Sequence, residues 1–310
     1  MQEQFVKIFP RDLREKVRKA EIHGLEEIRV RIGWPVEFLY GNRSEWLGSY
    51  DCMMDRNRLD EMLNYITGYS VYAMEEELRQ GFLPMKGGHR IGITGHAAYD
   101  MFPEGGMPRV KNLTDIGGLN IRIAHERKGC AKELLSHLRN GPSIYNTLFL
   151  AAPGGGKTTY LRDVIRLLST GDEEYEGLKC CVIDERSEIA ACVNGKPQND
   201  LGKRCDVLDA CPKLIGMKMV LRSMSPEVIA VDELGKAEEF VMLEEMCYSG
   251  VRLLGTLHAG EMKDALHNPL IQDAVKKDII QRFVELKKLP NGSRQCAIYD
   301  VQGELLWKNM

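Results

Sequence analysis

One short stretch of the sequence, residues 145–160, constrains the fold of this chain more than any other. An apolar run from Leu148 to Ala151 predicts a buried strand, and Pro153 and three consecutive glycines follow it. A helix-compatible segment then begins near Lys157. A strand, a glycine loop and a helix are the context in which the triplet Gly-Lys-Thr indicates a phosphate-binding loop. Glycines leave backbone N–H groups accessible and a helix N-terminus favours anions, so this stretch predicts a nucleotide-binding protein.

The residues of this loop have separate expected roles, with ATP and Mg²⁺ as the expected ligands. Lys157 is expected to reach the β- and γ-phosphates, and the Thr158 hydroxyl to hold Mg²⁺. Ala151 stands where the strict pattern begins with glycine, which is a mild change because the strand ends there. The alternative is a glycine-rich turn without a ligand. The expected nucleotide-binding residues are Pro153, Gly154, Gly155, Gly156, Lys157, Thr158 and Thr159.

The length and composition of the chain fit a soluble protein of two domains. Its 310 residues are enough for two cores, and a hydrophobic content of 44% is ordinary for a globular protein. A formal net charge of −3 gives no overall attraction to nucleic acid or anionic lipid. No apolar run is long enough to span a bilayer, and the N-terminus has no signal-peptide pattern. A cytoplasmic protein is therefore expected, with a peripheral position at a membrane left open.

The nine cysteines indicate reduced thiols rather than a metal site. No Cys-x-x-Cys pair occurs, and Cys205 and Cys211 have no second pair or nearby histidine to complete four ligands. Zinc is not expected.

Residues 1–126 predict a mixed α+β domain with an antiparallel sheet. Alternating apolar residues predict strands at 27–32, 36–40, 89–96 and 118–124, and helical spacing predicts helices at 55–66 and 70–80. Residues 127–143 are expected to form a linker and a short helix.

Residues 144–310 predict an α/β domain with a parallel sheet, because strands and helices alternate. Strands are expected at 147–151, 179–183, 228–231 and 251–257, and helices at 157–168, 211–224 and 236–248. A hairpin around Asn291 and Gly292 is expected near the end of the chain.

Polar side chains follow three of these strands, where parallel strands place them at one edge of the sheet. Asp232 is expected to hold Mg²⁺, and Glu233 to polarise the attacking water. His258, beside Thr256, is expected to sense the γ-phosphate, and Glu188 belongs to an acidic cluster with Asp184 and Glu185. The alternative for each acid is a solvated strand end.

Four motifs in order resemble the ATPases of type II and type IV secretion and of pilus motors. They are the phosphate-binding loop, the acidic segment 184–188, the segment 221–233 that ends in Asp232 and Glu233, and Gly-Thr-Leu-His at 255–258. The segments 26–31 and 119–126 narrow the resemblance to a sporulation family within this superfamily, found in endospore-forming bacteria. The resemblance covers essentially the whole chain.

The resemblance implies a RecA-like P-loop ATPase domain after a smaller N-terminal domain that rotates with nucleotide state. It implies a hexameric ring of identical subunits that powers a secretion channel between mother cell and forespore. The implied partners are membrane-embedded channel proteins, so the chain would lie at the inner face of a mother-cell membrane. Nucleic acid is not an expected partner.

The sequence departs from the pattern of this superfamily at several positions. The acidic segment has no proline and contains Arg186, while Asp232 stands where most secretion motors have glycine. Val251 replaces a histidine, and Gly235 and Lys236 stand where an arginine usually follows. An arginine that neutralises transition-state charge is expected from Arg222, or from Arg90, Arg109 or Arg122 of a neighbouring subunit.

Three other functions fit parts of the pattern. A nucleic-acid-stimulated ATPase would need a basic groove, and only the short pair Lys287 and Lys288 suggests one. A nucleotide-gated structural ring with little turnover is disfavoured by the presence of Glu233. A small-molecule kinase is disfavoured because no arginine-rich lid follows the sheet.

Overall fold

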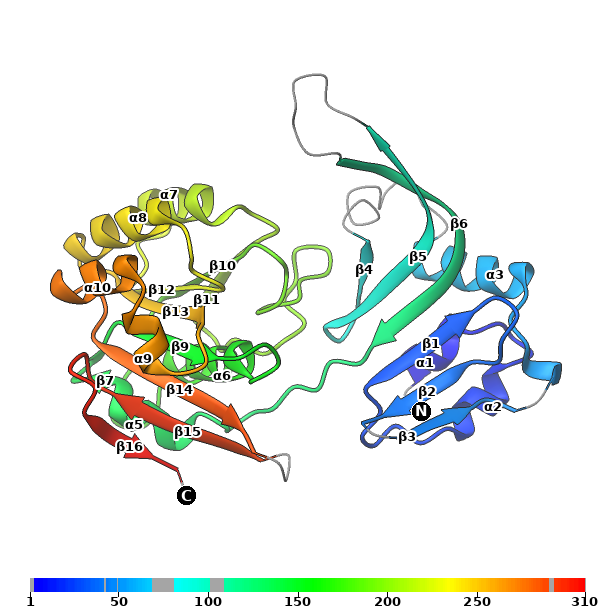
Figure 1. Ribbon diagram of the computed structural model, residues 1–310, viewed down its shortest axis with the longest axis horizontal. Coiled ribbons are helices and arrows are strands. Elements are labelled where there is room, and N and C mark those ends of the chain that lie inside the picture. The colour runs from blue at the N-terminus through cyan, green and yellow to red at the C-terminus, as the bar shows by residue number, and fades with distance from the viewer. Residues whose placement is uncertain are drawn as a thin grey trace. The chain divides into compact units, whose positions relative to one another are not determined.

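The computed structural model describes residues 3–41, 43–48, 50–68, 81–100, 109–289 and 293–309. The chain divides into two compact units, Met1–His125 and Glu126–Met310, each with its own sheet (Figure 1). The helix expected at 70–80 and the turn at Asn291 and Gly292 lie outside the described residues.

The first unit is built on an antiparallel sheet with the strand order β3-β2-β1-β6-β5-β4. Three α-helices, α1, α2 and α3, lie within its described residues. The core forms where apolar residues of α1 and α2, such as Phe5 and Val17, meet the buried side of β1 at Ile28 and Val30. The elements are α1 (Glu3–Ile8), α2 (Arg14–Lys19), β1 (Glu27–Arg31), β2 (Glu37–Tyr40), β3 (Arg43–Trp46), a 3-10 turn (Tyr50–Cys52), α3 (Arg56–Ile66), β4 (Phe82–Met85), β5 (His89–Asp100) and β6 (Arg109–Arg122).

Strand β6 begins well before the strand expected at 118–124. Its early residues pair with β5 alone, and the described side chains of this extension are mostly exposed. A ribbon that buries little of either face shows no clear alternation of apolar and polar residues, so the sequence does not predict it.

The second unit is built on an eight-stranded sheet, counted over the described residues, with the order β11-β10-β12-β13-β9-β14-β15-β16. The six strands from β11 to β14 are parallel, and β15 and β16 add to one edge in antiparallel fashion. The strands are β7 (Arg139–Asn140), β8 (Ser143–Ile144), β9 (Thr147–Ala151), β10 (Cys180–Asp184), β11 (Cys205–Asp209), β12 (Val228–Val231), β13 (Arg252–His258), β14 (Arg282–Lys288), β15 (Arg294–Tyr299) and β16 (Leu305–Lys308), with β7 and β8 in a small separate pair.

Helices cover both faces of this sheet. One apolar core joins α5 (Lys132–Leu138) and α6 (Lys157–Thr170) to the sheet, through residues such as Leu134 and Leu161. The other core joins α7 (Lys213–Ser223), α8 (Ala237–Tyr248), α9 (Met262–Leu266) and α10 (Pro269–Lys276) to the opposite face. A parallel sheet buried on both faces produces the continuous apolar strands seen in the sequence. The expected α/β fold class, with a preceding antiparallel α+β unit, is confirmed.

The sequence did not predict β11, α9 or α10. The sequence of β11, Cys205–Asp209, contains two acids and lies at the edge of the sheet, where it is only partly buried. The helices α9 and α10 are short, so neither has a long periodic pattern.

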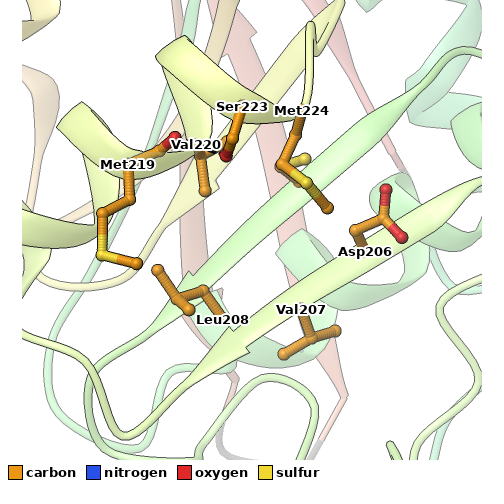
Figure 2. Close-up of a pocket in the computed structure, with 8 residues that line it drawn as sticks. Asp206, Val207, Leu208, Met219, Val220, Ser223 and Met224 are labelled. Atoms are coloured by element: carbon orange, nitrogen blue, oxygen red, sulfur yellow. Dashed lines mark hydrogen bonds between the residues drawn. The ribbon is translucent and has the colours of Figure 1, made fainter.

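A mostly apolar pocket of about 200 Å³ lies between α7 and the edge strands of the sheet (Figure 2). The residues that line it belong to α7, to the residue that follows α7, and to β10 and β11. In the sheet, β12 and β13 separate these two strands from β9. The lining residues are Cys181, Asp206, Val207, Leu208, Met219, Val220, Ser223 and Met224.

All nine cysteines carry free thiols. Over the described ranges, no helix combines the length and the apolar character needed to cross a membrane.

Candidate active site

The glycine loop between β9 and α6 has the conformation that its sequence requires. Gly154 and Gly156 have φ angles of 73° and 103°, in the left-handed region that favours glycine. A Cβ on Gly155 would lie 2.5 Å from the Ala151 Cβ and 2.9 Å from the Ala152 carbonyl oxygen. Ala151 is therefore tolerated at the start of the motif because residue 155 has no side chain. Helix α6 begins directly after the loop, at Lys157, so its free N–H groups adjoin the loop.

A pair of oxygen donors lies beside the loop. The Thr158 hydroxyl donates to Asp232 Oδ2 across 3.1 Å, and the Thr256 hydroxyl donates to Asp232 Oδ1. Thr158 lies in the first turn of α6, whereas Asp232 directly follows β12. A hydroxyl and a carboxylate are oxygen ligands of the kind that Mg²⁺ prefers, so the donor set fits the expected metal.

The Lys157 side chain is turned back toward the sheet. Its Nζ donates to the Ala151 carbonyl oxygen across 2.8 Å and lies 3.1 Å from His258 Nδ1 at the end of β13. Burial lowers the pKa of Lys157, and the negative charges of Asp232 and Glu233 oppose that change.

His258 connects Lys157 to Glu233. A lysine ammonium can only donate, so Nδ1 of His258 accepts its hydrogen bond and a neutral ring carries its proton on Nε2. That Nε2 lies 2.8 Å from Glu233 Oε1, and an Arg186 N–H donates to Glu233 Oε2 across 3.0 Å. Partial burial raises the pKa of Glu233. The His258 hydrogen bond and the charge of Arg186 together lower it by more than burial raises it, so the pKa lies below its usual value.

Lys213, a residue that the sequence did not single out, holds the backbone of Asp232 and Glu233 in place. Glu233 has a φ of 50°, which is strained for a residue with a side chain. The buried Nζ of Lys213 donates to the Asp232 carbonyl oxygen across 3.1 Å and to that of Glu233. It also forms ion pairs with Glu239 at 3.3 Å and Glu185 at 3.5 Å. A lysine at the start of a helix normally faces solvent, so no local signal identifies this role.

The acidic segment after β10 is folded around Asp184. The buried carboxylate of Asp184 accepts hydrogen bonds from the N–H groups of Glu188, Ile189 and Ala190 at 2.7, 3.0 and 2.8 Å. Burial raises the pKa of Asp184, although these hydrogen bonds act against the change. Arg162 of α6 donates to the carbonyl oxygens of Glu188 and Ile189. Asp184 thus shapes the loop, and Glu188 is held beside the helix that follows the glycine loop.

The predicted site residues are therefore not all brought together. Pro153 is exposed in the loop and Thr159 lies in the first turn of α6, as the motif requires. Arg222 is exposed in the last turn of α7, nine residues beyond Lys213, or about 14 Å along the helix axis. The structure thus places Arg222 away from the glycine loop of its own chain.

The other arginine candidates belong to the first unit. Arg90 of β5 faces Arg122 of β6 in the strand register, and its guanidinium lies over the ring of Phe82. The side chain of Arg109 is outside the described part of the structure.

Comparison of sequences finds one family model and one curated relative that match nearly the whole chain. A family model described as "Sporulation stage III, protein AA" matches residues 1–306. Stage III sporulation protein AA of Bacillus subtilis (strain 168) is 39% identical over 282 residues, which cover 91% of this chain and 89% of that protein.

Solved structures share the fold at low sequence identity. The pilus retraction motor PilT, solved with bound ADP, has a TM-score of 0.64 at 16% identity, with 100% of this chain and 84% of PilT covered. The ATPase DotB of Legionella pneumophila has a TM-score of 0.61 at 15% identity, with 94% and 81% covered. At such identities the likeness establishes the fold alone, and that fold is the one found in secretion-type ATPases.

Proposed function

This chain belongs to the sporulation stage III protein AA family, and from that premise we propose that it hydrolyses ATP as a secretion-type motor. The observation that carries this proposal is the bridge from Lys157 through His258 to Glu233, with Thr158 and Asp232 beside it. It supports the proposal because it brings a lysine suited to phosphate, an oxygen pair suited to Mg²⁺ and a candidate general base to one edge of the sheet.

The glycine loop would bind the phosphates of ATP. Its backbone N–H groups and the start of α6 favour an anion, and the Lys157 ammonium supplies a positive charge. A phosphate oxygen has more negative charge than the neutral His258 ring, so ATP would draw Lys157 away from Nδ1. Binding would therefore break one end of the bridge.

Thr158 and Asp232 would hold Mg²⁺, and Glu233 would orient the attacking water. When bound, Mg²⁺ neutralises charge on the β- and γ-phosphates. Glu233 must be ionised to accept a proton from water, and its lowered pKa keeps it in that form. Once Lys157 has left His258, the ring would be free to turn together with Glu233. Phosphate binding would in this way be coupled to the placement of the general base.

The motor would act as a hexameric ring at the inner face of the mother-cell membrane, where it would power a secretion channel between the mother cell and the forespore. A shared site between subunits accounts for the position of Arg222, which could serve only the site of a neighbouring copy. An arginine supplied in this way contributes about 10³–10⁵ in rate, so an isolated subunit would be nearly inactive.

The test is the steady-state ATPase rate against protein concentration, with the mass of the assembly measured at each point. For the wild type, the rate per subunit should rise cooperatively as the protein assembles. Glu233→Gln should lower kcat by about 10²–10⁴ and leave ADP binding unchanged. The control is Glu238→Gln, which changes an exposed acid in the first turn of α8.

A rate that depends on neither concentration nor Glu233 would overturn the motor and favour a nucleotide-dependent scaffold. Single-stranded RNA or DNA that stimulates the rate in a salt-dependent manner would favour a nucleic-acid-stimulated ATPase instead.

A further inference from the structure

An arginine from the C-terminal hairpin reaches the glycine loop. Arg294 is the first residue of β15, and its Nε donates to the Gly155 carbonyl oxygen across 3.2 Å. A Cβ on Gly156 would lie 2.7 Å from the same Nε and 3.1 Å from the Arg294 Cδ. The guanidinium therefore packs against the last two glycines of the loop, at a sequence separation of 139 residues.

The order of the strands determines which side of the loop this arginine occupies. Strand β9 leads into the loop and lies between β13 and β14, with β15 next to β14 (Figure 1). Lys157 meets His258 on the β13 side, and Asp232 and Glu233 follow β12 on that same side. Arg294 approaches from the β15 side. A nucleotide whose γ-phosphate faces Glu233 would thus turn its α-phosphate and nucleoside toward Arg294.

The guanidinium has capacity for a further anionic partner. It carries five N–H donors, and the hydrogen bond to Gly155 uses one of them. Within the described residues, no carboxylate forms an ion pair with Arg294. A half-buried arginine beside an anion-binding loop is suited to a phosphate, which accepts two parallel hydrogen bonds from one guanidinium.

A second arginine contributes positive charge to the same region. The hydroxyl of Tyr160, in the first turns of α6, has its pKa raised to about 12 by burial, and the charges of Arg294 and Arg127 act against that rise. Both guanidinium groups therefore add positive potential at the Tyr160 hydroxyl, near the start of α6.

We propose that Arg294 binds the α-phosphate of the nucleotide. This inference rests on the proposed function, because it assumes that the loop binds ATP. The α-phosphate is present in ATP and ADP and does not take part in the bond that breaks. Arg294 would therefore stabilise the ground state and the transition state equally, which changes affinity and leaves the chemical step unaltered.

The experiment compares Arg294→Ala with Lys288→Ala. Lys288 faces Arg294 across the hairpin and is exposed. Lys288→Ala therefore removes one positive charge from the same hairpin and is the matched control. Calorimetry with ADP and Mg²⁺ should give a Kd about 10–100-fold higher for Arg294→Ala, because hydrogen bonds to a charged group are lost. The KM for ATP should rise by a similar factor, with kcat unchanged. Lys288→Ala should match the wild type, and Arg294→Lys should fall between.

Other ligands and variants separate the competing explanations. GDP keeps the α-phosphate and changes the base, so its affinity should fall by the same factor as that of ADP. A loss confined to ADP would assign Arg294 to the base and overturn the proposal. Equal ADP affinity of Arg294→Ala and the wild type would also overturn it, as would a lower melting temperature of the nucleotide-free variant that accounts for the loss. Failure of the wild type to bind any nucleotide would instead remove the proposed function, and this inference with it.

Discussion

His258 accepts a hydrogen bond from Lys157 on one ring nitrogen and approaches Glu233 within 2.8 Å through the other. The lysine expected to bind phosphate and the carboxylate expected to orient water are therefore joined by a single side chain. Lys157 must therefore leave His258 before it can bind a phosphate.

Removal of the imidazole should separate binding from turnover. In His258→Ala, Lys157 has no hydrogen bond to His258 that must break before it can bind a phosphate. ADP should therefore bind about 3–10-fold more tightly, which corresponds to the net free energy of one hydrogen bond. Turnover of ATP should fall at least tenfold, because Glu233 loses the ring that orients it. Calorimetry and the ATPase rate measure the two effects.

The control for this variant is His267→Ala, which removes an exposed imidazole after α9. A His258→Ala protein in which affinity and rate fall together would contradict the exchange of partners, since it would mean that His258 supports nucleotide binding.

The pH dependence of turnover should report on Arg186. The pKa of Glu233 is raised by partial burial and lowered by more through His258 and Arg186, so it lies below the usual value. The active carboxylate persists as the pH falls and is lost only when the pH passes below that lowered pKa. In Arg186→Ala one lowering influence is absent, and the acidic limb of kcat/KM, which reports the pKa of the free enzyme, should move to higher pH.

Salt provides an independent check, because the Arg186 side chain is 66% exposed and its charge is screened. High salt should move the acidic limb of the wild type in the same direction as Arg186→Ala and have little effect on the variant. Arg204→Ala, in which an arginine paired with Glu176 is lost, is the control. An acidic limb that stays in place in Arg186→Ala would rule out this influence on Glu233.

The sequence predicted the parts of the site that depend on local order. The strand at Thr147–Ala151, the helix from Lys157 and the acids after β12 were all expected where they occur. Each follows from a short pattern: an apolar run, a glycine loop, or a strand ending in charges. Strand order then brings these segments together, because parallel strands end at one edge.

The contacts that the sequence missed join distant segments. Arg294 lies on β15 and touches Gly155 because β15 pairs with β14 and β14 pairs with β9. The residues next to Arg294 and Gly155 in the sequence do not predict this contact. Lys213 is buried because α8 brings Glu239 to it. The sequence also named Arg222 as a catalytic candidate, and the length of α7 places it away from the glycine loop of its own chain.

The dependence of turnover on Mg²⁺ concentration should identify Asp232 as a ligand of the metal. In Asp232→Asn one of the Thr158 and Thr256 hydroxyls can still donate to the amide oxygen, and the other can accept from the amide NH2. The fold should therefore persist, but the negative charge that attracts Mg²⁺ is lost. The Mg²⁺ concentration for half-maximal turnover should rise about tenfold or more, a ratio that corresponds to ~1.4 kcal/mol. Chelation of the metal should abolish turnover by the wild type.

Asp206→Asn, in the edge strand β11, removes an exposed carboxylate and controls for net charge. A normal Mg²⁺ requirement in Asp232→Asn would exclude this carboxylate as the metal ligand.

Lys213 should be important for stability as well as for the site. Its Nζ compensates the Glu239 carboxylate, whose side chain is 2% exposed, and binds the two carbonyl oxygens of the strained turn. Lys213→Met leaves that buried charge without its partner, which should cost about 3–5 kcal/mol of unfolding free energy. Lys218→Met, on an exposed position of the same helix, should cost little. Denaturant unfolding measures both.

The double variant Lys213→Met with Glu239→Gln separates loss of the charge pair from loss of the turn. If the uncompensated charge dominates, neutralising Glu239 should recover much of the lost stability, and the two changes should be strongly non-additive. Activity should not recover, because the carbonyl oxygens of Asp232 and Glu233 would still lack the ammonium that holds the turn at φ 50°. Additive losses of stability would show that Lys213 and Glu239 act separately, and recovered activity would show that the turn holds its shape without Lys213.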